Sequence, residues 1–572
     1  MVPGTELPIE YWFYNEVFKW RCGASVWWTA IFSIITSTLY ILLSYLLTLS
    51  DYFSALFTLY SFLFVLFALG IHILMAIYNT TQCTVLPRIS VTRLGNVVAF
   101  FKPKCILQCI FFIMSSIFIT IFASWIMKPT LANLTLPCAE KSEGRCLNEH
   151  KLFLIVVAIY QGLLYHLHYY VNQYEYTHFL IIQQAKFFHI KSQLFPIFIE
   201  SIKLIFKQLV IFYPVFYILG HLPRDMAASI LGLEISSNAS LSSINNLLQP
   251  DLFLQALLLG TYVYFLWNLS ILLLKTYITE SYEFNIESGF QYLSNKCLHN
   301  ALTCKNNPWV QYLGFQDLFQ LSRFSFARRQ VIFSATFPGC HPKNWTKIYH
   351  TCLETLTALK DSTQEFNHNA FVSAAVPQHN TSNWLIQNSA APVSRYMKPT
   401  SVGNISLDET ANGALHKEEK TKISLSTKIW DALKKKPVFG YFLRDLPDAT
   451  ARKLFSSVQI HIWAVEGLSC LVAASLIEDS LGIVQQNLPL ILDVLLSLYE
   501  NVERHFKLTS NLGRRSPNNV NTSYDLMLRH AFRSALKSSI YRIVTTFGSC
   551  IMDFQLGPEQ KRRLKLFLEY KE

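Results

Sequence analysis

The sequence predicts a mainly α-helical membrane protein, in which a polytopic six-helix transmembrane domain is followed by a cytoplasmic, largely all-helical domain. Composition is the first reason. The 572 residues are 51% hydrophobic and 15% charged, with a mean hydropathy of +0.27, whereas soluble proteins average roughly 25% charged residues. The second reason is that uncharged apolar runs of about 20 residues, enough for one helix to cross a bilayer, recur along the first half of the chain.

Residues 1–23 are expected to be a cytoplasmic N-terminus. A cleaved signal peptide begins with a basic region and ends at small residues, whereas this segment has Glu6, Glu10 and Glu16 and neither feature. The net charge of the chain is +12, and its Lys and Arg residues are scattered among apolar runs. We therefore attribute this charge to membrane topology and expect no direct nucleic-acid partner.

Residues 24–275 are predicted to form the six-span transmembrane domain. Five uncharged runs have the length of a crossing, and they cover residues 24–49, 56–78, 105–127, 152–174 and 252–274. The remaining run, 208–223, is short and contains Pro214. It can complete a crossing only if Lys203 and Lys207 extend their ammonium groups to the interface.

The cations predict which side each loop faces, because short loops rich in Lys and Arg stay in the cytoplasm. The loops after the second and fourth spans are the basic ones, with Arg88, Arg93, Lys102, Lys104, Lys186, Lys191, Lys203 and Lys207. This bias places both termini in the cytoplasm.

The loop between the third and fourth spans is then luminal. It contains a glycosylation sequon at Asn133, and a second sequon at Asn238 lies in the next large luminal loop. Cys138 and Cys146 share the first loop, where oxidising conditions permit a disulfide bond. Two free thiols remain the alternative, because connectivity cannot be deduced from sequence.

The predicted spans lack the groups that a transport pathway needs. Their apolar centres contain no Asp, Glu, Lys or Arg, the residues that mark ion and proton pathways in membranes. His72, His166 and His168 are interpreted as interhelical hydrogen-bonding groups rather than as a proton relay. Three residues separate His221 from Asp225, one fewer than in the HxxxxD pattern of membrane acyltransferases. A multi-pass transporter or a lipid-modifying membrane enzyme is therefore the alternative that the sequence favours less.

Residues 276–361 are predicted to be a cytoplasmic juxtamembrane segment. Arg328 and Arg329 could bind an acidic partner or a lipid headgroup, although two adjacent arginines more often end a helix in solvent. Six Cys and His residues lack the paired spacing of a zinc site; they are Cys297, His299, Cys304, Cys340, His341 and Cys352. The chain also has no GxSxG, HExxH or P-loop motif. We expect no enzymatic activity, catalytic residue, cofactor, metal ion or small-molecule substrate.

Residues 362–425 are predicted to be a flexible linker, because they are rich in Ser, Thr, Asn and Gln and cannot bury enough apolar surface to fold. Residues 426–572 are predicted to form a helical C-terminal domain. Apolar residues recur in it at three- and four-residue steps, as at Leu454, Val458, Ile462 and Val465.

A basic, partly apolar segment lies near the start of this C-terminal domain. Its characteristic residues are Ile429, Trp430, Leu433, Lys434, Lys435 and Lys436. Such a pattern can lie on an anionic membrane surface. A basic face exposed to water is the alternative.

Several long blocks resemble one protein family. They include QDLFQLSRFSFARRQVIFS and cover residues 146–153, 181–187, 316–348, 458–485, 532–548 and 562–572. The blocks resemble animal members of the nuclear-division-cycle family of transmembrane nucleoporins. The resemblance implies a nuclear pore membrane anchor with six spans and both ends on the cytoplasmic or pore side. It also implies that the soluble half binds nucleoporins such as the WD-repeat protein aladin and inner-ring components, and that the protein helps to insert pores into the nuclear envelope.

Overall fold

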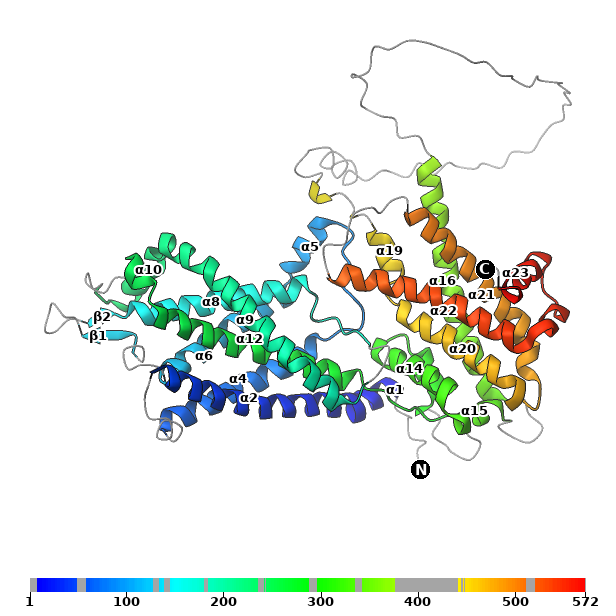
Figure 1. The fold of residues 1–572 in the computed structure, drawn as a ribbon, viewed down its shortest axis with the longest axis horizontal. Helices are drawn as coiled ribbons and strands as arrows, with labels where there is room; N and C mark the ends of the chain where they lie inside the picture. The colour runs from blue at the N-terminus through cyan, green and yellow to red at the C-terminus, as the bar shows by residue number, and fades with distance from the viewer. Residues whose placement is uncertain are drawn as a thin grey trace, which may run out of the picture.

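The computed structural model describes residues 8–48, 58–126, 133–137, 145–179, 184–234, 241, 243–287, 296–334, 342–375, 441–443, 446, 448–510 and 520–570. These residues are mainly helical, which confirms the predicted fold class. An elongated helix bundle, called here the membrane domain, adjoins a second set of packed helices, called here the body (Figure 1).

In the described part of the chain, six long helices make up the membrane domain, and each overlaps one predicted span. They are α2 (Lys19–Thr48), α4 (Leu59–Gln82), α6 (Pro103–Ser124), α8 (Glu149–Val171), α9 (Lys186–Leu219) and α12 (Pro250–Ile278). All six are long and apolar enough to cross a membrane. Their outward faces carry exposed Trp27, Phe62, Leu107 and Phe195, as expected for helices that contact lipid.

Helix α9 differs from the short fifth run predicted from the sequence. It contains 34 residues and continues through both Pro196 and Pro214, so it is about 50 Å long at the usual rise per residue. The uncharged run begins only after Lys207, whereas the helix includes Lys203 and Lys207, which are exposed on one side of it. The predicted span is therefore shorter than the observed helix, because the prediction counted only uncharged residues.

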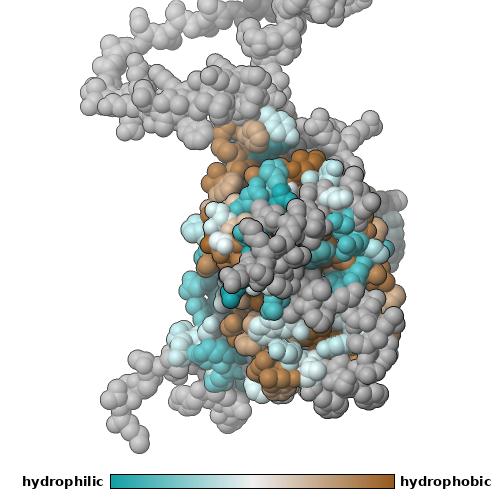
Figure 2. Space-filling view, turned by 90° about the vertical axis from the view of Figure 1, so that its left-hand side faces the viewer, coloured by the Kyte–Doolittle hydropathy of each residue, from teal (hydrophilic) through white to brown (hydrophobic). Residues whose placement is uncertain are grey.

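Short elements connect the ends of the bundle. At the end far from the body are β1 (Thr135–Pro137), β2 (Arg145–Leu147), α10 (His221–Leu231) and α11 (Ile244–Leu247). The two strands pair antiparallel, with Leu136 opposite Cys146. Figure 2 views the molecule from this end, where hydrophilic patches lie between hydrophobic ones. At the opposite end, α1 (Ile9–Trp12) and the π-helix η1 (Phe13–Phe18) lead into α2, and α5 (Arg93–Phe100) precedes α6.

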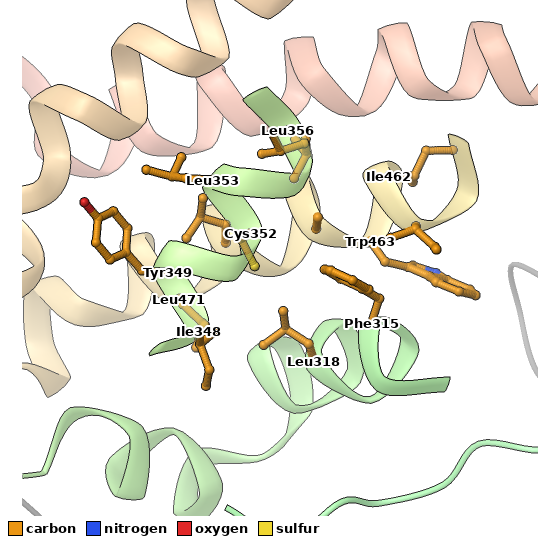
Figure 3. Packing of buried hydrophobic residues seen from close by; sticks show 14 of the residues in the cluster. Phe315, Leu318, Ile348, Tyr349, Cys352, Leu353, Leu356, Ile462, Trp463 and Leu471 are labelled. Carbon is orange, nitrogen blue, oxygen red and sulfur yellow. The ribbon is translucent and has the colours of Figure 1, made fainter. Parts of the chain in front are cut away.

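The body consists of helices from both sides of the predicted linker. They are α13 (Leu298–Thr303), α14 (Pro308–Phe324), α15 (Phe326–Phe333), α16 (Lys343–Ala375), α19 (Ala449–Leu454), α20 (Val458–Glu478), α21 (Ile483–Ser510), α22 (Val520–Phe547), the 3-10 helix η3 (Gly548–Asp553) and α23 (Pro558–Leu568). One apolar cluster connects them. Figure 3 shows its centre, where Phe315 and Leu318 of α14, Cys352 and Leu356 of α16, and Trp463 of α20 lie close together.

Two predicted boundaries differ from the observed helices. Helix α16 continues to Ala375, past the predicted start of the linker at residue 362. Asn367 is buried in it and donates a hydrogen bond from Nδ2 to the Asn501 carbonyl of α21 at 2.9 Å. Described residues of the predicted segments 276–361 and 426–572 also share one apolar core instead of forming separate units. The helical end of α16 was not predicted because its residues are polar. The shared core was not predicted because the two segments lie far apart in the sequence. Residues 376–425 lie outside the described residues.

Among the described residues, α20 is a seventh helix that is long and apolar enough to cross a membrane. Every residue from Val458 to Val465 is buried, and α20 packs between α14 and α22 in the body. A helix that is apolar on all sides is found either in a membrane or at the centre of a large core. The surrounding helices give α20 the second environment, and the count of six crossings stays a prediction.

Candidate functional site: the junction between membrane domain and body

The chain passes directly from α12 into the body, and Arg21 of α2 fixes this passage. The buried guanidinium of Arg21 donates hydrogen bonds to the carbonyls of Ile278, Glu280 and Ser281 at 3.1, 2.5 and 3.0 Å. The last carbonyls of a helix have no partner within the helix and carry partial negative charge. A cation in this position therefore caps α12 and holds α2 against the start of the body.

The loops that follow α4 and α8 pair with each other beside Arg21. The Thr84 amide donates to the Glu175 carbonyl at 2.8 Å, and the Thr177 amide donates to the Thr84 carbonyl at 2.9 Å. Arg88 of the first loop forms an ion pair with Glu175 at 2.9 Å and lies over the Tyr170 ring at 3.8 Å. These contacts hold the loop after α4 and the loop after α8 against each other.

The second loop also enters the core of the body. Phe179 is 3% exposed, and its ring centroid lies 5.5 Å from those of both Tyr312 and Trp463. The neighbouring His178 ring lies 4.1 Å from the Tyr524 ring. Burial, with a smaller effect of Lys275, lowers the pKa of His178 to about 4, so this imidazole is neutral near pH 7. The loop is therefore part of the same packed core as the body helices.

The first residues of the chain pack on the same side. The Trp12 and Phe13 rings contact Tyr282 at 5.9 and 6.2 Å, and Phe13 also stacks on Phe284. The Phe284 amide in turn donates to the buried Asp317 carboxylate at 2.9 Å. The helix that begins the membrane domain is thereby attached to α14 of the body.

Arg328 and Arg329 take structural positions, contrary to the solvated helix end favoured by the sequence. Arg328 makes two hydrogen bonds with the Asp317 carboxylate at 2.6 and 2.7 Å and a third with the Phe284 carbonyl at 2.6 Å. Arg329 pairs with Glu478 of α20. Burial raises the pKa of Asp317, although Arg328 opposes the shift. Both arginines hold helices together and have little surface left for a ligand.

The remaining predicted site residues are only partly described. Cys146 in β2 is buried and disulfide-bonded. Cys138 lies outside the described residues, so this pairing stays a prediction. The membrane-surface residues Ile429, Trp430, Leu433, Lys434, Lys435 and Lys436 also lie outside them. Within the described ranges, no three His, Cys, Asp or Glu side chains are grouped as metal ligands. His72 bonds with Ser33 at 3.1 Å, and His168 bonds with Tyr174 at 3.0 Å.

Sequence reasoning missed the residues that build the junction. Neither Arg21 nor Phe179 was identified from the sequence as a candidate functional residue. The available signal was an aromatic residue in a short loop directly after a span, where a polar residue is more usual. The partners of these residues lie 130 and more positions away in sequence, so spacing alone could not identify them.

The chain is similar along nearly its whole length to known nuclear pore proteins. A family model described as "Nucleoporin protein Ndc1-Nup" matches residues 16–565. Nucleoporin NDC1 of Homo sapiens is 30% identical, with 97% of each chain covered. The proteins of the same name from Xenopus laevis and Danio rerio are each 29% identical and cover 97% and 98% of this chain, and 99% of their own lengths.

Proposed function

The chain belongs to the Ndc1-Nup family of nucleoporins, and we propose that it anchors the nuclear pore complex in the nuclear envelope and supports pore assembly and insertion by recruiting soluble nucleoporins. The family places it in the nuclear pore membrane, among structural components of the pore and not among enzymes. The recruited proteins in this proposal are an aladin-type WD-repeat protein and inner-ring components. Both chain termini lie on the cytoplasmic or pore side.

The junction is the observation that supports anchoring most directly. Val85, Phe179 and Trp12 come from three segments attached to membrane helices, and all belong to the apolar cluster of the body. A body held in this way cannot rotate freely relative to the bilayer. It keeps its surface next to the membrane, where the local concentration of any bound partner is raised.

An exposed apolar surface on the body supports recruitment. Phe324 is 79% exposed and Ile477 is 91% exposed. Leu476 and Ile477 directly precede Glu478, and Phe324 and Phe326 flank Ser325 at the start of α15, the helix that the Arg329–Glu478 ion pair joins to the end of α20. Clustered apolar side chains on a surface are typical of protein–protein contact sites.

Affinity purification of the full chain from cells tests the recruitment step. A Phe324→Asp, Ile477→Asp double variant is expected to lose soluble nucleoporins, while Phe371→Asp, which changes a 66% exposed side chain on α16, retains them. Equal recovery of nucleoporins with both variants would contradict recruitment through this surface.

Protease protection in sealed microsomes tests the orientation. Tags at both ends of the full chain are expected to be digested without detergent. A protected C-terminal tag would place the body in the lumen and end the anchoring proposal.

A further inference from the structure

A cavity of about 390 Å³ lies beside the junction, between the start of α9 and the end of α12. Basic side chains from α9 and α12 line it, namely Lys186, His189 and Lys275, and the neutral imidazole of His178 from the loop after α8 adds a hydrogen-bonding group. Glu280 is the one acidic side chain among the described residues of its lining. The cavity therefore has an excess of groups that attract an anion.

Two of these basic groups are already held in place by the protein. The Lys275 ammonium donates to the Tyr176 carbonyl at 2.8 Å, which leaves it further N–H donors. Lys186 and Glu280 form an ion pair at 2.7 Å, with both side chains 38% exposed. An ion pair this accessible to water is weak, so Lys186 can contact a ligand without losing much stabilisation. Nδ1 of His178 is buried and has no hydrogen-bond partner in the described part of the chain.

The start of α9 adds partial positive charge to the same cavity. Gln184, Ala185 and Lys186 line it, and Ala185 is the N-cap residue, which has no side-chain hydrogen bond to the helix. The first amide groups of a helix attract anions when no side chain occupies them. The lysines and the helix start thus favour the same sign of ligand charge.

The position of the cavity indicates that this anion is part of a lipid. Lys275 directly follows the predicted sixth span, residues 252–274. Phe187 and Phe188, next to Lys186, are 68% and 64% exposed. Aromatic side chains beside basic ones are typical of the boundary between hydrocarbon and headgroups. Apolar surface for acyl chains and a cationic cavity for a headgroup therefore lie side by side.

We propose that this cavity binds the headgroup of an anionic phospholipid. Lys186 and Lys275 contact the phosphate, and the acyl chains lie along Phe187 and Phe188. A headgroup such as that of phosphatidylserine also has an ammonium group, and the Glu280 carboxylate is placed to accept a hydrogen bond from it. The proposal depends on the membrane position of α9 and α12 and not on which nucleoporins the body recruits.

Native mass spectrometry of the purified full chain in detergent tests the site, with phosphatidylserine, phosphatidylcholine and inorganic phosphate as separate probes. Phosphatidylserine is expected to bind more tightly than phosphatidylcholine. Lys186→Gln should weaken phosphatidylserine binding about fivefold, the effect of about 1 kcal/mol per basic residue near an anionic lipid. Lys186→Arg keeps the charge and should retain binding.

Lys305→Gln is the matched control, because Lys305 also forms a single exposed ion pair, with Glu354 at 2.9 Å, but lies on the body away from the cavity. Ala185→Leu tests the same site by steric filling at unchanged charge and should also weaken phosphatidylserine binding. Unchanged binding by both Lys186→Gln and Ala185→Leu would overturn the proposal, and so would an equal loss with Lys305→Gln. Displacement of the lipid by an equal concentration of inorganic phosphate would show that free phosphate, and not a lipid, is the ligand.

Discussion

Arg329 and Glu478 form a hydrogen-bonded ion pair across 149 positions of sequence. Nε and Nη2 of Arg329 donate to the two carboxylate oxygens at 3.0 and 2.8 Å, and the side chains are only 13% and 9% exposed. The pair joins α15 to the end of α20, helices that lie on opposite sides of the predicted linker in the sequence. It therefore helps to make one body from two segments that the sequence places apart.

Replacement of Arg329 by Ala should lower the free energy of unfolding of the body by about 3 kcal/mol, because it leaves a largely buried carboxylate without its partner. Denaturant unfolding of the full chain in detergent, followed by tryptophan fluorescence, measures this loss. Arg504→Ala is the control, since Arg504 and Glu500 are 60% and 42% exposed and such pairs contribute less than about 1 kcal/mol. Similar losses in both variants would contradict a structural role for Arg329.

The sequence predicted the long apolar helices of the first half well, because a single local property determines them. Apolar runs without charge identify helices such as α4 and α6, since bilayer thickness sets their length. The same property failed at α9, where Lys203 and Lys207 are compatible with a helix because they lie on its outer side. The resemblance to nucleoporins depended on long blocks such as 316–348, and the family comparison confirmed it.

The junction could not be predicted, because its contacts join distant residues. Nothing near Arg21 in sequence indicates that it caps α12, since its acceptors are the carbonyls of Ile278, Glu280 and Ser281. Arg328 and Arg329 look like solvent-exposed charges until Asp317 and Glu478 are placed beside them. Composition likewise assigned the end of α16 to a linker, although tertiary packing stabilises its polar residues in a helix.

Replacement of Phe179 by Ala should loosen the attachment of the body to the membrane domain. The side chain fills a space between Tyr312 and Trp463, and removal of a buried Phe costs about 3–5 kcal/mol. We expect faster hydrogen exchange in α14 and α20, with the exchange of α4 and α6 unchanged, measured by mass spectrometry on the full chain. Phe187→Ala removes an exposed ring close by in sequence and should leave the exchange of α14 and α20 as it is. Protection of both helices in Phe179→Ala would show that this ring does not join the two parts.

Mild acid should destabilise the body through His505. Its side chain is fully buried between the Phe366 and Phe455 rings, at 5.0 and 5.1 Å. Burial lowers the pKa of His505 from 6.5 to about 4. The positive charge of Arg529 adds to this shift, and the negative charge of Asp448 opposes it. The unfolded chain therefore takes up a proton below about pH 6.5 that the folded chain does not take up until about pH 4. The stabilisation is complete above this window and is lost as the pH falls through it.

The expected loss from this one histidine between pH 7 and pH 5 is about 2 kcal/mol. Denaturant unfolding at both pH values measures it, and His505→Leu should reduce the difference between them by that amount. His350→Leu changes an exposed histidine of α16 and should leave the difference unaltered. The idea fails if His505→Leu shows the same pH dependence as the original chain.

A close helix crossing in the membrane domain provides the last prediction. A Cβ atom on Gly162 of α8 would lie 2.7 Å from Cα of Ile113 in α6, closer than two such carbons can approach. The obstacle is backbone, so no side chain can rotate away, and small residues at such crossings allow helices in membranes to pack closely. Gly162→Ala should therefore separate α6 from α8 and destabilise the membrane domain by about 1–3 kcal/mol, the usual effect of overpacking.

Gly70→Ala in α4 is the matched control, because a Cβ there meets nothing within 4 Å and Ala favours the helix more than Gly does. Thermal unfolding of the full chain in detergent should show a lower midpoint for Gly162→Ala and an equal or higher midpoint for Gly70→Ala. If both variants melt with the original chain, α6 and α8 do not cross at Gly162 as closely as described.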